Sequence, residues 1–180
     1  VTDANGCSTA SLPVTITQPA TAVSVTLTSQ TNVLCFGTST GAINITATGG
    51  TSPYTYTWTG TGVAAGAEDQ TGLAAGNYSV IVTDANGCST ASLSITITQP
   101  ATAVSVALTS QTNVLCFGVS TGAINITATG GTGAYTYAWT GTGVIAGAED
   151  QTGLAAGNYS VIVTDANGCS TASLPVTITQ

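Results

Sequence analysis

The chain repeats itself with a period of 81 residues. Residues 19–99 and residues 100–180 are identical at 73 of 81 positions, and residues 1–18 closely match the end of each of these units. A constant long period is the signature of a tandem repeat, in which each repeat is one structural unit. The sequence therefore predicts two whole units, preceded in residues 1–18 by the C-terminal hairpin and last strand of another unit. We expect the chain to be part of a longer tandem array.

The composition excludes several functions. The chain has no Lys, Arg or His, and its seven charged side chains are all acidic. Binding to nucleic acids and to anionic membranes depends on Lys and Arg, and no apolar run reaches the roughly 20 residues of a spanning helix. We therefore expect neither nucleic-acid binding nor membrane insertion. Because 43% of the residues are hydrophobic and only 4% are charged, we expect a folded chain rather than a disordered one.

Alternating apolar and polar residues predict five strands in each unit. In the first unit they cover residues 23–28, 43–48, 54–59, 78–83 and 93–98. Strict alternation and an excess of Thr and Val are typical of half-buried strands. The segment 61–73 holds one or two further strands, and the pattern leaves this open. The sequence thus predicts an all-β chain of tandem immunoglobulin-like antiparallel β-sandwich domains.

Four aromatic residues are expected in the cores of these sandwiches. Trp58 lies on the inward face of the third strand, and Tyr78 opens a later strand where a tyrosine corner would lie. Their counterparts in the second unit are Trp139 and Tyr159. Tyr54 and Tyr56 share the face of Trp58, so a carbohydrate-stacking row is the alternative to core packing. We favour core packing, since aromatic residues dominate the cores of sandwiches.

The motif VTDANGC predicts a hairpin turn. Asn-Gly is the strongest short hairpin signal, because both residues tolerate positive φ. The alternative is a Ca²⁺ site, since Asp-x-Asn-Gly resembles the start of an acidic Ca²⁺ loop, but the later ligands are missing. We favour the turn and expect no cofactor. The turn residues are Asp84, Asn86 and Gly87, and in the second unit Asp165, Asn167 and Gly168.

Each unit carries two cysteines, Cys35 and Cys88 in the first and Cys116 and Cys169 in the second. No CxxC spacing indicates zinc, and an extracellular chain favours disulfides. If the segment 61–73 holds one strand, strict up-down alternation brings Cys35 and Cys88 to the same end of the unit. If it holds two strands, Cys35 faces the hairpin of the next unit and pairs with Cys169. We slightly prefer the pairing within a repeat.

Ordered motifs in each unit carry a family resemblance. Cys-x-Gly at 35–37 and Gly-Ala-Ile at 41–43 precede Gly-Gly-Thr-x-Pro-Tyr-x-Tyr-x-Trp at 49–58. Leu-x-x-Gly-x-Tyr-x-Val-x-Val-x-Asp-x-x-Gly-Cys follows at 73–88, and an apolar strand and Gln-Pro close the unit. The combination resembles the SprB-type repeat of very long surface adhesins of gliding Bacteroidota. The second unit departs from it with Gly133-Ala134 in place of Ser-Pro.

The resemblance implies an extracellular, cell-surface, filamentous protein without catalytic residues. An enzyme is disfavoured on other grounds as well, because no His or Lys can act as a base and Glu68 and Asp69 are adjacent in sequence. We expect a structural repeat that forms a stiff, protease-resistant rod. Its partners would be neighbouring identical repeats in the same chain, or other copies in a multi-chain filament. The alternative function is a module whose repeats themselves bind a carbohydrate or another surface ligand.

Overall fold

Each 81-residue unit folds into six β-strands. The structure is a computed structural model that describes residues 1–180. The strands of the first unit are β1 (Ser24–Thr31), β2 (Gly41–Thr48), β3 (Thr55–Thr59), β4 (Gln70–Leu73), β5 (Gly76–Thr83) and β6 (Leu93–Ile97). Those of the second unit are β7 (Ser105–Thr112), β8 (Gly122–Thr129), β9 (Thr136–Thr140), β10 (Gln151–Leu154), β11 (Gly157–Thr164) and β12 (Leu174–Ile178). No helix is present, so none could cross a membrane.

The six strands of a unit form two three-stranded antiparallel sheets. One sheet has the order β1-β2-β4 and the other the order β3-β5-β6, and the second unit repeats both. These orders correspond to the ABE and CFG strands of an immunoglobulin sandwich in which strand D is absent. The predicted fold class, tandem immunoglobulin-like β-sandwiches, is therefore confirmed.

Each unit has a hydrophobic core of its own. Ten buried residues form the core of the first unit and ten others form the core of the second. Along β2 and β5 the buried residues alternate with exposed or half-buried ones, because successive side chains of a strand point to opposite faces. Because the two cores are separate, each unit packs its core independently of the other.

The predicted core aromatics lie against these cores. Trp58, Tyr78 and Tyr159 are buried, whereas Trp139 is half-buried and packs against the second core. The Tyr78 hydroxyl donates a hydrogen bond to the carbonyl oxygen of Ala74, four residues upstream, at 2.8 Å. This geometry is the tyrosine corner of immunoglobulin-like domains. Tyr54 and Tyr56, which could have formed an exposed row with Trp58, pack against the same core.

The ambiguous segment 61–73 contains one strand, β4, yet the chain crosses the unit twice there. β4 turns into β5 within two residues, and β3 pairs antiparallel with β5, so β3 and β4 run in the same direction. Residues 60–69 must therefore run back along the unit without joining a sheet. The amide of the fully buried Gln70 holds this return segment by bonding both the N–H and the C=O of Ala64.

This return segment overturns the assumption of strict up-down alternation. β1 is antiparallel to β2, and β2 is antiparallel to β4, so β1 runs opposite to β5. The loop after β1, which carries Cys35, therefore lies at one end of the unit. The hairpin after β5, which carries Cys88, lies at the other end.

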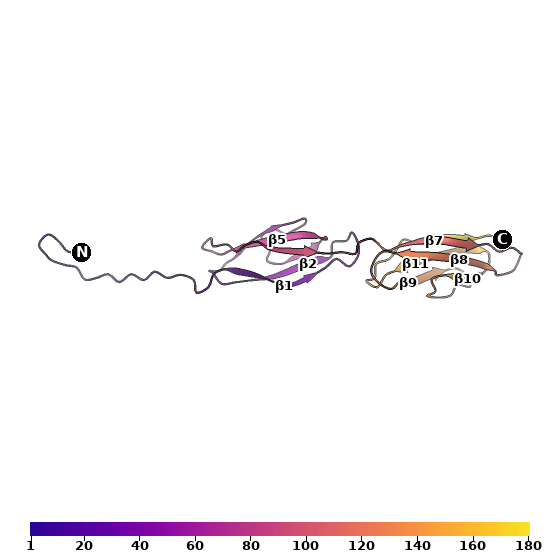
Figure 1. The fold of residues 1–180 in the computed structure, drawn as a ribbon, viewed down its shortest axis with the longest axis horizontal. Coiled ribbons are helices and arrows are strands. Elements are labelled where there is room, and N and C mark those ends of the chain that lie inside the picture. Colours follow the sequence, from indigo (N-terminus) through magenta and orange to yellow (C-terminus); the bar gives the residue numbers. More distant parts are fainter.

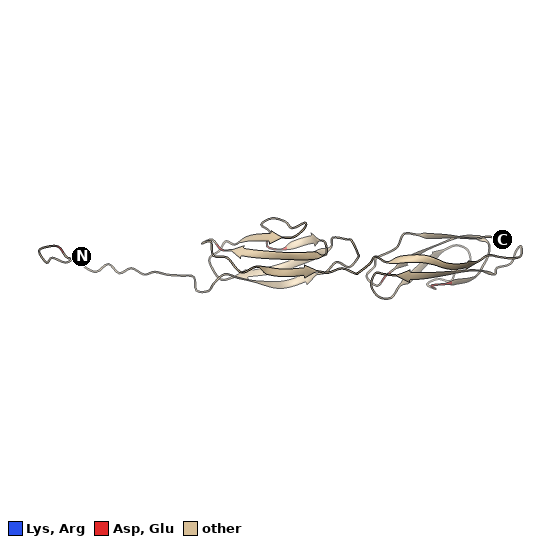
Figure 2. Ribbon diagram, turned by 45° about the horizontal axis from the view of Figure 1, so that its top comes forward, with Lys and Arg blue, Asp and Glu red and all other residues tan.

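The two units follow one another end to end, and residues 1–18 extend from the first (Figure 1). Within these 18 residues the predicted hairpin turn forms, with a bridge between Thr2 and Ser8. The residues after it are exposed and form no strand. Acidic side chains are few along the molecule, and no basic ones are present (Figure 2).

Candidate functional site

The β5–β6 hairpin is organised by the carboxylate of Asp84. One carboxylate oxygen accepts hydrogen bonds from the N–H groups of Asn86 at 2.9 Å and Cys88 at 2.8 Å. The other oxygen accepts from the N–H of Thr51 at 3.0 Å, in the loop between β2 and β3. Gly87 adopts a φ of 83°, as the predicted turn requires. The carboxylate thus faces N–H donors, and it fixes the hairpin against the neighbouring loop.

The same turn occurs in all three copies of the motif. Asp165 accepts from the N–H groups of Asn167, Cys169 and Thr132, and Gly168 has the same positive φ as Gly87. In residues 1–18, Asp3 accepts from the N–H groups of Asn5 and Cys7. The turn is therefore local, since it forms even where no sandwich surrounds it.

These hydrogen bonds lower the pKa of Asp84 below its ordinary value of 3.8. The bond from the Cys88 N–H is the largest cause, burial opposes it, and the Thr51 and Asn86 N–H groups add to the lowering. For Asp165, burial is the largest single influence and raises the pKa, but four backbone N–H groups together outweigh it. Both carboxylates are accordingly charged at neutral pH.

Replacing Asp84 with Asn is expected to lower the melting temperature of the first unit at pH 7, because an amide is a weaker acceptor than a carboxylate for three N–H donors. A depressed folded-state pKa gives stability that is present above the unfolded pKa of about 3.9 and is lost as pH falls through the folded pKa. The difference in melting temperature between Asp84→Asn and the unaltered chain should therefore shrink below about pH 4. Asp3→Asn, in the isolated copy of the turn, is the control and should leave both units unchanged. A difference that persists at pH 2 would contradict this explanation.

In the first unit the loop between β1 and β2, residues 32–40, lies at the end opposite to the β5–β6 hairpin. In the first unit the Val33 N–H donates to the carbonyl oxygen of Thr98 at 2.9 Å, and the Gly37 N–H donates to the side-chain oxygen of Gln99 at 2.9 Å. These bonds fix the loop beside the residues that lead into the second unit. Leu34, Cys35 and Phe36 lie between the two anchors.

The interface between the units brings this loop onto the hairpin of the second unit. Cys35 and Cys169 form a disulfide with a Cα–Cα distance of 5.6 Å. The Asn167 side-chain amide donates to the carbonyl oxygen of Leu34 at 3.2 Å. The hairpin of the second unit therefore contacts the cysteine loop of the first unit, and a disulfide bond links the two.

The preferred pairing within a repeat is not the one that the structure contains. Cys35 and Cys88 lie at opposite ends of the first unit, because residues 60–69 return the chain without forming a strand. The alternative pairing, Cys35 with Cys169, is the one formed. Cys7, Cys88 and Cys116 are free and exposed.

Two further acidic residues, Asp69 and Asp150, bond to the backbone of their own units. Asp69 accepts a hydrogen bond from the N–H of Ile45 at 3.0 Å, and Asp150 makes the same contact with Ile126. Burial, followed by the charge of Glu68, raises the pKa of Tyr56 to about 12. No three His, Cys, Asp or Glu side chains gather as a metal-binding group would require.

The outer faces of the sheets carry paired hydroxyl and amide groups. Thr28 and Thr46 are 2.7 Å apart across β1 and β2, and Thr59 and Ser79 are 2.7 Å apart across β3 and β5. No buried side-chain nitrogen or oxygen lacks a hydrogen-bond partner. On these Thr-rich faces, hydroxyl groups on neighbouring strands therefore form hydrogen bonds with one another.

Each unit matches a known repeat family over part of its length. The family described as the SprB repeat matches residues 27–63 and residues 108–144, one segment in each unit. Each unit therefore contains a segment that matches the SprB repeat, which confirms the resemblance seen in the sequence motifs. No curated protein matches the chain.

Two solved structures are similar to the chain. The three N-terminal domains of the bacteriophage RB49 highly immunogenic outer capsid protein (Hoc) give a TM-score of 0.41 at 21% identity, covering 87% of this chain and 58% of that one. A C-terminal 282-residue fragment of intimin, in complex with the intimin-binding domain of the translocated intimin receptor, gives 0.43 at 13% identity, covering 86% of this chain and 64% of that one. The chain thus spans less than two thirds of either structure.

Proposed function

We propose that the chain is a stiff structural section of a long extracellular surface protein, an adhesin or filament of the SprB type. The observation that carries this proposal is the interface between the units. A disulfide and a hydrogen bond from Asn167 join the end of one sandwich to the beginning of the next. Pro100 at the seam restricts the connecting backbone as well. Two sandwiches held in this way act as one elongated body.

The chemistry of the chain supports an extracellular location. Disulfides persist in oxidising compartments such as the cell exterior and are rare in the cytosol. With no Lys or Arg in 180 residues, proteases that cut after basic residues find no site. The SprB repeat, present in both units, implies a surface protein as well. Together these features favour a protease-resistant structure outside the cell.

The alternative of a carbohydrate-binding repeat receives less support from the structure. A stacking surface would need exposed aromatic side chains, but Tyr54 and Tyr56 pack with Trp58 against the core. The hydroxyl groups of the outer faces pair with one another across the strands. We therefore assign the repeats a structural role, and we place ligand recognition elsewhere in the parent protein.

The stiffness of the two-unit body can be tested by small-angle X-ray scattering. The double variant Cys35→Ser/Cys169→Ser should keep both sandwiches, because each has its own core. Without the bond the units should bend relative to each other, so the distribution of the molecule's maximum dimension should broaden. The triple variant Cys7→Ser/Cys88→Ser/Cys116→Ser is the matched control, since it keeps the disulfide and should scatter like the unaltered chain. Identical scattering from the double variant and the control would show that the bond does not stiffen the junction.

The location can be tested on the cells that make the protein. Antibodies against the folded 180-residue chain, detected by immunogold electron microscopy on unpermeabilised cells, should label thin fibres outside the envelope. Labelling only after permeabilisation would overturn the proposal.

A further inference from the structure

The turn of each hairpin contains an Asn-Gly peptide bond, at residues 5–6, 86–87 and 167–168. Such a bond is chemically labile, because glycine has no side chain that would hinder the approach of its backbone nitrogen to the asparagine amide. In this reaction the glycine nitrogen bonds to Cγ of the asparagine, the Cγ–Nδ2 bond breaks, and ammonia leaves with the proton of the glycine N–H. Water then opens the resulting succinimide ring and gives aspartate or isoaspartate. No reactant other than water is needed.

The turn of the second unit holds both reacting groups in place. The Gly168 N–H donates to the carbonyl oxygen of Asp165 at 3.0 Å. Nδ2 of Asn167 donates to the carbonyl oxygen of Leu34, in the first unit, at 3.2 Å. The disulfide between the units ends at Cys169, two residues after Asn167. The Asn167 side chain therefore cannot rotate toward the Gly168 nitrogen without breaking its bond across the interface.

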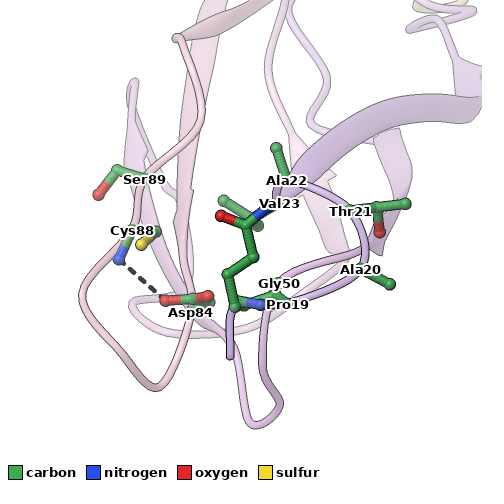
Figure 3. Close-up of a pocket in the computed structure, with 10 residues that line it drawn as sticks. Pro19, Ala20, Thr21, Ala22, Val23, Gly50, Asp84, Cys88 and Ser89 are labelled. Carbon is green, nitrogen blue, oxygen red and sulfur yellow. Dashed lines mark hydrogen bonds between the residues drawn. The ribbon is translucent and has the colours of Figure 1, made fainter. Parts of the chain in front are cut away.

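The first unit contains the same turn without such a contact. Its Gly87 N–H likewise donates to the carbonyl oxygen of Asp84. The Asn86 side chain, however, donates to the hydroxyl of Thr51 in its own unit, at 2.9 Å, and it is exposed, whereas Asn167 is half-buried. Figure 3 shows the open space beside this turn, a cavity of about 380 Å³ bordered by Asp84. In a longer array the preceding repeat would fill this space, so Asn86 in this chain is the reference for an open turn.

We propose that Asn167 is a deamidation site that the interface between the units controls. A closed interface suppresses the reaction, because the Leu34 carbonyl oxygen holds the Asn167 amide and the Cys35–Cys169 bond holds the turn. An open interface allows the reaction. This inference rests on the stiff two-unit body proposed above, and it names the position at which that body ages chemically.

The product of the reaction would weaken the same contact. Deamidation replaces a donating amide with a carboxylate, which has only acceptors and would face the Leu34 carbonyl oxygen. In isoaspartate the main chain also runs through the side-chain carbon atoms, so the turn that carries Cys169 gains an atom. An opening of the interface that lasts long enough for the reaction would thus leave a permanent mark, and this mark favours further opening.

The rates at the two turns can be compared in one sample of the 180-residue chain, incubated at mildly alkaline pH. The chain is then unfolded, reduced and cleaved after aromatic residues, and mass spectrometry detects the conversion of amide to carboxylate. Asn167 lies in the peptide 160–180 and Asn86 in the peptide 79–117. Asn167 should react about tenfold or more slowly than Asn86, because a hydrogen bond and a disulfide restrain it.

Opening the interface should remove this difference. In the double variant Cys35→Ser/Cys169→Ser the Asn167 rate should rise to the Asn86 rate, which should not change. The unaltered chain kept in a reductant should behave in the same way, and it provides the measurement if the variant fails to fold. The variant with Ser at the three free cysteines keeps the bond and is the matched control. Equal rates in the unaltered oxidised chain, or an Asn167 rate that neither treatment raises, would disprove the proposal.

The effect of the product is tested by Asn167→Asp, which places the carboxylate in the turn directly. A dithiol reductant should reduce the Cys35–Cys169 bond of this variant about tenfold faster than that of the unaltered chain, because a hydrogen bond that closes the interface is lost. Asn86→Asp, the same change in the turn of the first unit, is the control and should leave the reduction rate unchanged. Equal reduction rates in the two variants would refute the weakening. X-ray scattering tests the stiffness of the two-unit body separately, so a failure of this inference is distinguishable from a failure of the proposed function.

Discussion

Replacing Ile43 with Ala is expected to destabilise the first unit by about 2–5 kcal/mol and to leave the second unit unchanged. Ile43 is completely buried in the first core, on β2. Shortening it removes buried methyl and methylene groups and leaves a cavity that the close-packed neighbours fill only in part. The two cores are separate, so the loss should stay within one unit.

The chain offers a reporter for each unit, because it has two tryptophans, Trp58 and Trp139. Urea unfolding followed by fluorescence should show the full loss in a Trp139→Phe background, where Trp58 reports on the first unit. A Trp58→Phe background should show none. Ile124→Ala, the same change in the second unit, should give the mirror result, and Ile81→Ala on the outer face should cost less than about 1 kcal/mol. An equal loss in both units would mean that they unfold together.

Replacing Gly60 with Ala is expected to cost the first unit at least about 2 kcal/mol. Gly60 has a φ of 132°, which L side chains rarely adopt, and a methyl group there would overlap the ring of Tyr78. Tyr78 cannot easily move away, since its ring is buried and its hydroxyl donates to the carbonyl oxygens of Ala74 and Thr61. The substitution therefore forces apart the turn after β3 and the tyrosine corner.

Gly62 provides the matched control for this prediction. Its φ is 79°, and no atom lies within 4 Å of the position that a methyl group would take. Gly62→Ala should therefore show the backbone cost alone, about 1–2 kcal/mol. Chemical denaturation of both variants gives the comparison. If Gly60→Ala costs no more than Gly62→Ala, contact with the Tyr78 ring is not what makes Gly60 necessary.

The strands could be predicted because each face of each sheet has a different environment. Alternation along β2 and β5 marks which side chains face the core, and this local signal does not depend on the neighbouring unit. Trp58 and Tyr78 could be assigned in the same way, since large aromatic residues on the inward face of a strand are usually buried in the core. The Asp84 turn could be predicted because the bonds that close it, from the N–H groups of Asn86 and Cys88, are local in sequence. The bond from the Thr51 N–H, which comes from the loop between β2 and β3, could not.

The return segment 60–69 could not be predicted, because no periodic pattern forms it. The Gln70 amide holds it by accepting a hydrogen bond from the Ala64 N–H and donating one to the Ala64 carbonyl oxygen. The Trp58 indole N–H also donates to the carbonyl oxygen of Ala67. A glutamine is ordinarily assigned to the surface, and nothing in the sequence marks this one as buried. The disulfide pairing depends on this segment, because the segment sets the direction of β5 and hence the end at which Cys88 lies.

The interface between the units could not be predicted, because its prediction requires knowing which loops lie at each end of a unit. The sequence does contain one sign of it, the apolar pair Leu34 and Phe36 on either side of Cys35 in a loop between Thr-rich strands. Leu34 and Phe36 are 52% and 46% exposed beside the second unit, whereas Leu115 and Phe117, at the same positions of the second unit, are each 90% exposed. Gln99 and Asn167, which bond to this loop, carry no sign of that role in the sequence.

The Cys35–Cys169 bond also determines how the molecule carries mechanical load. The bond joins residues 134 positions apart, and residues 36–168 form a closed covalent loop between them. When the two ends of the chain are pulled, the tension runs from residue 35 directly to residue 169 through the sulfur atoms. The strands from β2 to β11 lie off that path, so the force cannot stretch them out even if they unfold. The extension of the chain under tension is therefore limited to the short segments outside the loop.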